Sequence, residues 1–127
     1  MLGFLNMQVS KTESLNRIVK LIETFHDFSN LIRPAGDAEG NILTRTRTVF
    51  AQFEFELCTE LSRLGGTVVK SDEAGPLTLH DALDRISHQY RDALNGAITA
   101  HTRAMLMRQL EEIRKIEAEV FVFNGAA

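Results

Sequence analysis

The sequence predicts an all-α protein that folds as an antiparallel four-helix bundle. Apolar residues recur at spacings of three and four along four separate stretches, which is the period of an amphipathic helix. Turn or capping residues separate each stretch from the next. Only residues 67–69 have strand character, and one short run cannot form a sheet. With 127 residues, we expect one domain over residues 1–127.

The first helix is expected over residues 11–33. Ser10 and Glu13 have the spacing of a capping box, in which each side chain bonds a backbone N–H of the first turn. Pro34 is expected to end the helix, and residues 33–41 have the composition of a loop. The apolar face is wide, as a bundle core requires, and comprises Leu15, Ile18, Val19, Leu21, Ile22, Phe25, Phe28, Leu31 and Ile32.

The second helix is expected over residues 42–64. Its first half is rich in threonine, a β-branched residue that loses side-chain freedom in a helix. Gly65 and Gly66 follow, and glycine readily adopts the left-handed conformation that ends a helix. The predicted core face consists of Phe50, Phe53, Leu57, Leu61 and Leu64.

The third helix is expected over residues 79–94. Thr78 is its predicted N-cap, and Asp81 lies where a carboxylate favours the positive end of the helix dipole. Asn95 and Gly96 form the stop signal. The predicted apolar face consists of Leu79, Leu83, Ile86, Tyr90 and Ala93.

The fourth helix is expected over residues 98–121. Its predicted core face consists of Leu106, Leu110, Ile113 and Val120, with Met105 and Ile116 alongside. Its predicted solvent face consists of Gln109, Glu111, Glu112, Arg114 and Lys115. The terminal segments MLGFL and VFVF are more apolar than free ends usually are, so we expect a homodimer. A different protein is the other binding partner that we consider. The other interpretation of VFVF is a last helical turn packed on its own core.

Composition excludes some classes of function. The net charge is −3 with both signs interspersed, which argues against a nucleic-acid-binding protein. No apolar run reaches the roughly 18–20 residues of a membrane span. Cys58 is the single cysteine and cannot form an intrachain disulfide, so we expect a cytoplasmic protein in which this thiol is buried and inert.

Weak metal-binding candidates are found on three of the predicted helices. Glu23 and His26 form one Glu-x-x-His pair beside the apolar stripe of the first helix. Glu60 and Glu117 each fall where the stripe of their helix calls for an apolar residue. A carboxylate at such a position binds a metal, reaches water at a bundle end, or accepts a hydrogen bond from Tyr90 or an arginine.

The histidines of the second half of the chain carry a weaker signal. His80, Asp84 and His88 lie four residues apart along one helix face, a spacing compatible with a divalent ion but also with a solvated polar face. His101 has no evident partner in the sequence. We find no catalytic motif and expect no catalytic residue.

Residues 53–66, FEFELCTELSRLGG, resemble the second helix of a family of uncharacterised bacterial ferritin-like four-helix bundles, a domain of unknown function. Residues 15–16, 90–94 and 108–112 look like parts of the other helices. The resemblance implies a ferritin-like scaffold. Relatives carry a metal-ligating Glu-x-x-His-type pair where this chain has Val49 and Gln52, and they can carry a histidine at Glu117. The resemblance therefore also implies a degenerate metal site.

We therefore expect a non-enzymatic bundle that acts through self-association or by binding a protein partner, without a cofactor. The alternative is a ferritin-like iron- or manganese-binding protein or oxidase, which would need Glu23, His26, Glu60 and Glu117 to converge in one cavity. A cavity for a small apolar ligand is a third hypothesis.

Overall fold

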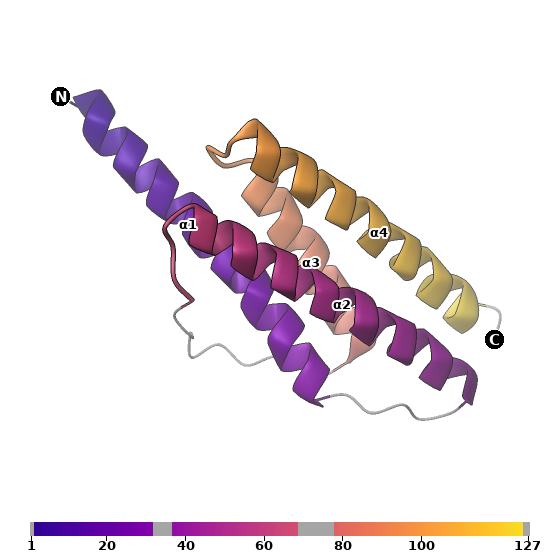
Figure 1. The fold of residues 1–127 in the computed structure, drawn as a ribbon. Helices are drawn as coiled ribbons and strands as arrows, with labels where there is room; N and C mark the ends of the chain where they lie inside the picture. The colour runs from indigo at the N-terminus through magenta and orange to yellow at the C-terminus, as the bar shows by residue number, and fades with distance from the viewer. Residues whose placement is uncertain (1, 32–36, 69–77, 126–127) are drawn as a thin grey trace.

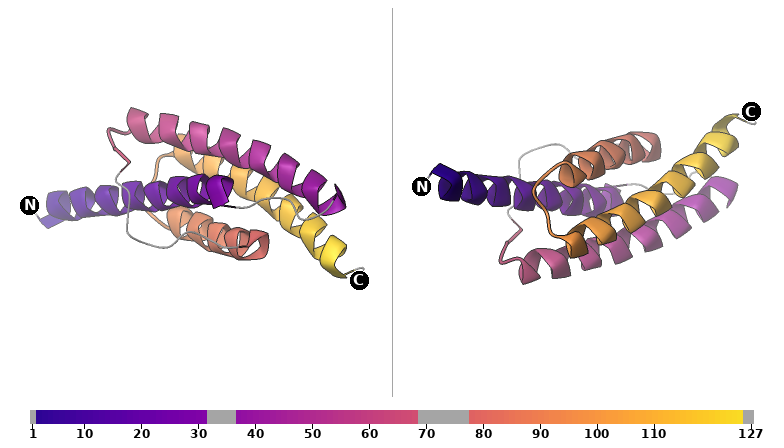
Figure 2. Two further views of the ribbon diagram at one scale, coloured as in Figure 1. Left: turned by 90° about the horizontal axis from the view of Figure 1, so that it is seen from below. Right: turned by 90° about the horizontal axis from the view of Figure 1, so that it is seen from above.

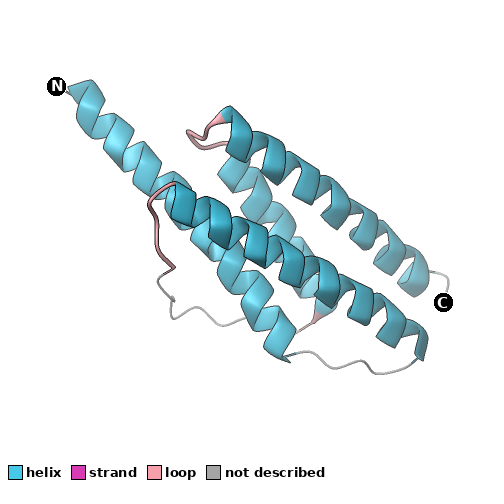
Figure 3. Ribbon diagram, viewed as in Figure 1, coloured by secondary structure: helices cyan, strands magenta, loops and turns pink. Residues whose placement is uncertain are grey.

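The computed structural model describes residues 2–31, 37–68 and 78–125 of the chain. These residues are helical apart from the connections, and none of them lies in a strand (Figure 3). The all-α prediction is confirmed, because four helices pack against one another (Figure 1). The helices are α1 (Leu2–Leu31), α2 (Asp37–Arg63), α3 (Leu79–Leu94) and α4 (Ala100–Gly125).

α1 packs against α2 and α3, and α4 packs against α3 and, less extensively, against α2. The aromatic residues of α1 and α2 set their register, since Phe25 contacts both Phe50 and Phe53 while Phe28 contacts Phe50. Ser14 donates to the carbonyl of Ala97 at 3.1 Å and so ties the middle of α1 to the connection before α4. The first turns of α1 extend beyond the other helices (Figure 2).

The predicted apolar faces form one core. Leu15, Leu64, Leu79, Met105 and Ile116 are half-buried against it. The predicted position Ile32 lies outside the described residues, and the side chain of Leu31 is not described. The buried members of the core that were predicted are Ile18, Val19, Leu21, Ile22, Phe25, Phe28, Phe50, Phe53, Leu57, Leu61, Leu83, Ile86, Tyr90, Ala93, Leu106, Leu110, Ile113 and Val120.

Three predicted helix starts differ from the structure. α1 begins at Leu2, so Ser10 and Glu13 lie inside the helix and the capping box predicted for them is wrong. The residues before Ser10 include leucine, methionine and glutamine, which are good helix formers and allow the helix to continue towards the N-terminus.

The second start differs for a similar reason. α2 begins at Asp37 and contains Gly40, so the loop predicted over residues 33–41 is wrong for residues 37–41. Alanine and glutamate at positions 38 and 39 are good helix formers, and the single glycine costs only about 1 kcal/mol relative to alanine. Pro34 lies outside the described residues.

The third start to differ is that of α4. α4 begins at Ala100 rather than 98, because the hydroxyl of Thr99 accepts from the N–H of Thr102 at 3.2 Å and caps the helix.

The end of α2 and both ends of α3 lie within one residue of the prediction, while the predicted end of the first helix at residue 33 lies outside the described residues. Gly65 has φ +84° and follows the end of α2. The N–H of Gly66 bonds the carbonyl of Leu61 at 2.9 Å and the N–H of Gly65 bonds that of Ser62 at 3.0 Å, which is the Schellman arrangement. Thr78 caps α3 by accepting from the N–H of Asp81, and Asn95 follows its last turn. α4 continues to Gly125, beyond the predicted end at 121. Among the described residues, no helix combines the length and hydrophobicity needed to cross a membrane.

Candidate functional site

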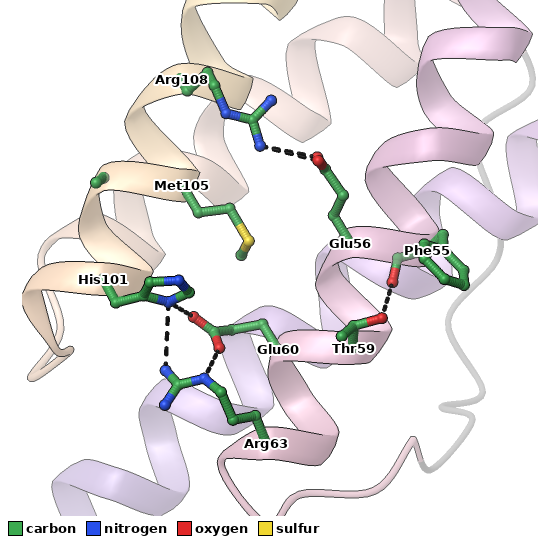
Figure 4. Close-up of a pocket in the computed structure, with 9 residues that line it drawn as sticks. Phe55, Glu56, Thr59, Glu60, Arg63, His101, Met105 and Arg108 are labelled. Carbon is green, nitrogen blue, oxygen red and sulfur yellow. Dashed lines mark hydrogen bonds and ion pairs between the residues drawn. The ribbon is translucent and has the colours of Figure 1, made fainter.

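A pocket of about 540 Å³ opens between α2 and α4, near the end of α2 and the start of α4 (Figure 4). We call it the α2–α4 groove. The side chain of Met105 points into its middle, and a charged cluster lies on each side of this methionine. The residues that line the groove are Phe55, Glu56, Thr59, Glu60, Arg63, His101, Ala104, Met105 and Arg108.

Glu60 is the centre of the first cluster. The residue is only 3% exposed, although carboxylates are seldom buried unless they are paired. One carboxylate oxygen accepts a hydrogen bond from Nε of Arg63 one turn later in α2. The other oxygen lies 2.8 Å from Nδ1 of His101 and 2.9 Å from the hydroxyl of Thr102, both in α4. The buried carboxylate therefore joins the end of α2 to the first turn of α4.

These partners stabilise the charged form of Glu60. The hydrogen bond from Arg63 lowers the pKa of the carboxyl, burial acts in the opposite direction, and the hydrogen bonds from His101 and Thr102 lower it further, to about 2. The carboxylate thus stays ionised far below neutral pH. At neutral pH it accepts hydrogen bonds from three side chains.

Nδ1 of His101 lies between a carboxylate oxygen of Glu60 and Nη2 of Arg63, at 2.8 and 3.5 Å. A carboxylate only accepts and a guanidinium only donates. A proton on Nδ1 satisfies the shorter of the two contacts, so we assign this tautomer to the ring. The imidazole side chain itself is 72% exposed at the edge of the groove.

Glu56 is the centre of the second cluster, one turn before Glu60 in α2. Both of its carboxylate oxygens accept from Nη2 of Arg108, at 3.1 and 3.0 Å, and one also accepts from Nε2 of Gln109 at 2.9 Å. The amide oxygen of Gln109 accepts from the hydroxyl of Tyr90 at 2.7 Å. Burial, followed by the charge of Glu56, raises the pKa of Tyr90, which keeps this phenol a donor. The chain of bonds links α3, α4 and α2.

The metal-binding candidates do not converge. Glu60 accepts from an arginine, as one of the predicted alternatives has it, whereas Glu117 accepts from Ser87 of α3 rather than from Tyr90 or an arginine. His26 is exposed and lies 3.4 Å from Glu54, across the contact of α1 with α2. Glu23, one turn earlier in α1, is half-buried.

The oxygen ligands that a dinuclear metal centre needs are thus spread over the molecule. No group of three histidine, cysteine, aspartate or glutamate side chains in the described ranges could hold a metal ion. The carboxylate of Glu60 also faces Arg63, a cation, which competes with a metal for its oxygens. Of the two positions that depart from the ferritin-like pattern, Val49 packs against the core and Gln52 is exposed.

The polar row of the third helix is solvated. His80, Asp84 and His88 are exposed, and His88 lies 3.8 Å from the carboxylate of Asp84. Cys58 is half-buried, and burial followed by the charge of Glu54 raises the pKa of its thiol. The thiol is thus less buried than predicted, and its raised pKa favours the protonated form, which is a poor nucleophile.

Sequence reasoning missed part of the site. His101 was predicted to have no evident partner and Gln109 to face solvent, and both predictions are wrong, because His101 pairs with Glu60 and Gln109 is fully buried. The signal is spacing: Thr102, Gln109 and Ile113 fall in the helical register of Leu106, so a polar residue there must find a buried partner.

No protein-family model matches this chain, and no curated protein or solved structure is significantly similar to it. The ferritin-like resemblance therefore rests on the short motifs alone.

Proposed function

We propose that this protein is a non-enzymatic helical bundle that acts by binding another protein chain, either a partner or a second copy of itself, at the α2–α4 groove. The observation that carries the proposal is the combination of an open groove containing Met105 with Phe55 at its outer edge, 72% exposed on α2. A large aromatic side chain left in water beside a groove is typical of a surface that another chain covers.

The charged groups of the groove support a structural rather than a catalytic role. Glu60 stays ionised, with a pKa of about 2, and Glu56 accepts from both Arg108 and Gln109. Both carboxylates are thus engaged in holding α2 to α4. General acid–base chemistry needs a group with a pKa near the working pH, and the pKa of Glu60, about 2, lies far below it.

We also propose that the four helices form an antiparallel bundle. The support is the order of the contacts, because residue numbers rise along one helix as they fall along its neighbour. Glu60 pairs with His101, Glu56 with Arg108, and Arg45 with Glu119. A ferritin-like origin is a further proposal, supported by the motif at residues 53–66.

The binding proposal is tested by photo-crosslinking from position 55. Phe55 is replaced by a photoreactive phenylalanine analogue in cells of the source organism, and His88, 67% exposed on α3, is replaced in the same way as the matched control. We expect a discrete adduct from position 55 and none from position 88. The mass of the adduct separates a second copy from a different partner. Irradiated cells without an adduct at position 55 would reject the proposal.

The expected homodimer has a separate test. Sedimentation velocity over a hundredfold range of concentration should show a dimer that dissociates on dilution, and Phe55→Glu should shift it towards monomer. A wild-type protein that stays monomeric throughout would reject self-association. The binding of a different protein would then be the remaining form of the proposal.

The alternative is an iron- or manganese-binding protein, for which the described residues offer little support because Glu60 and Glu117 are already bonded to Arg63 and Ser87. Elemental analysis of protein purified from cells supplemented with iron or manganese decides between a metal-binding and a protein-binding function. A content of about one or two metal ions per chain would favour the metal protein.

A further inference from the structure

The charged side chains that the α2–α4 groove exposes most are two arginines. The side chains of Arg63, His101 and Arg108 are 51%, 72% and 53% exposed. Their carboxylate partners lie beneath them, since the side chain of Glu60 is 2% and that of Glu56 26% exposed. A molecule that approaches the groove therefore meets guanidinium and imidazole groups first, although the chain as a whole carries a net charge of −3.

The apolar part of the groove lies between these polar groups. Met105 projects into the space between the cluster of Glu60 and the cluster of Glu56 (Figure 4). His101 and Arg108 are seven residues apart in α4, and Met105 is four residues after the first and three before the second. One helix face therefore presents an imidazole, an apolar side chain and a guanidinium at successive turns, over a rise of about 10 Å. Arg63 of α2 reaches the imidazole end of this face, since its Nη2 lies 3.5 Å from Nδ1 of His101.

We propose that the groove binds an acidic amphipathic helix, whose carboxylates pair with Arg63 and Arg108 and whose apolar side chain covers Met105. The inference rests on the proposed binding function and adds the chemistry of the partner. Arg63 lies beside His101, seven residues before Arg108 in α4, so the two guanidinium groups are about two helical turns apart. The expected pattern of the partner is an acidic residue, an apolar residue three or four positions later, and a second acidic residue seven positions after the first. Phe55 lies at the edge of the groove on the outer side of α2 (Figure 4).

Arginine suits this role. Arg108 uses Nη2 for both of its recorded bonds to Glu56, which leaves other N–H groups of the guanidinium to face a ligand carboxylate. The groove is largely open to solvent, whereas pockets for small molecules enclose most of their ligand. A helix that lies along the groove matches this shape better than an enclosed metabolite does.

A displayed library of helical peptides tests the proposal without assuming a partner. The library holds peptides of about 16 residues with net charges from negative to positive, and the bait is the full-length chain. We expect the enriched peptides to carry the acidic–apolar–acidic pattern. Their affinity should fall at least tenfold on Arg108→Glu, and a peptide in which only the acid facing position 108 is changed to lysine should regain binding to that variant.

Arg114→Glu is the matched control, because it makes the same charge change at an exposed position of α4 that does not line the groove. It should leave affinity within about twofold of the wild type. Thermal unfolding of each variant checks that it is folded, and Arg108→Gln, which avoids a new carboxylate beside Glu56, repeats the measurement if Arg108→Glu unfolds.

The outcomes separate the two proposals. Enriched peptides that are neutral or basic but still lose affinity on Phe55→Ala and Met105→Ala would overturn the acidic partner and leave the binding function standing. A selection in which no enriched peptide depends on Phe55, Met105 or Arg108 would overturn both.

Discussion

The two sides of α2 are built by different chemistry. Towards α1, Phe50 meets Phe25 and Phe28 edge-on, with ring centroids 4.8 and 5.2 Å apart, and all three are fully buried. Towards α4, the contacts are carboxylates with arginine, histidine and amide groups, and a groove remains open. The first side gains stability from buried apolar area. The second gains less net energy per contact but requires particular partners, so it sets how α4 lies on α2.

Truncation of the aromatic side should have the largest effect. Phe50→Ala removes a fully buried ring that contacts two others and should lower the free energy of unfolding by about 3–5 kcal/mol. Urea denaturation followed by circular dichroism measures the change. A loss below about 1 kcal/mol would mean that the α1–α2 contact is not the stable side of the helix.

The charged contacts between α2 and α4 should contribute less to stability than the aromatic ones between α2 and α1. Glu60→Gln removes the negative charge that Arg63, His101 and Thr102 share, and should cost about 2 kcal/mol, because the first two partners can turn to water and only Thr102 stays fully buried. Glu119→Gln is the control, since its bond to Arg45 is exposed and should contribute less than about 0.5 kcal/mol. Equal losses in the two variants would contradict the special position of Glu60.

The contribution of Glu60 should also depend on pH. Its pKa is about 2 in the folded protein against 4.5 for an ordinary glutamate, so the folded state binds fewer protons in this interval. The stabilisation is present in full above about pH 4.5 and is lost as the pH falls towards 2. The difference in unfolding free energy between wild type and Glu60→Gln, measured from pH 6 to pH 2, should therefore shrink on acidification. A difference that stays constant would show that the carboxylate is not paired as described.

Periodicity predicted the aromatic side of α2 but only part of the polar side. Phe50, Phe53 and Leu57 recur at helical spacing, and burial of such a stripe does not depend on which helix covers it. Gln109 and His101 could not be placed in this way, because a polar residue is buried only when a partner from another helix meets it. The spacing of Glu60 indicated an unusual position, but Arg63, His101 and Thr102 had to be brought together by the fold.

Tyr90→Phe examines the buried end of the polar side. The change keeps the ring but removes the hydroxyl that donates to Gln109 at 2.7 Å, and the amide oxygen then lies unpaired in a fully buried position. We expect a loss of about 1–2 kcal/mol in the free energy of unfolding. A double variant with Gln109→Leu should recover part of this loss, because it removes the unpaired group as well. Additive losses in the double variant would contradict coupling between the two side chains.

Phe55→Ala should have the smallest effect on stability, because a side chain 72% exposed buries little area within the chain. The free energy of unfolding should change by less than about 0.5 kcal/mol. Phe50→Ala, one and a half turns earlier in the same helix, makes the same chemical change at a buried position, so the pair compares the aromatic core with the groove directly. If Phe55→Ala leaves stability unchanged but weakens binding of a second chain, the two faces of α2 have separate roles, one for folding and one for recognition. If it destabilises the protein as much as Phe50→Ala does, Phe55 belongs to the core and cannot carry the proposed binding.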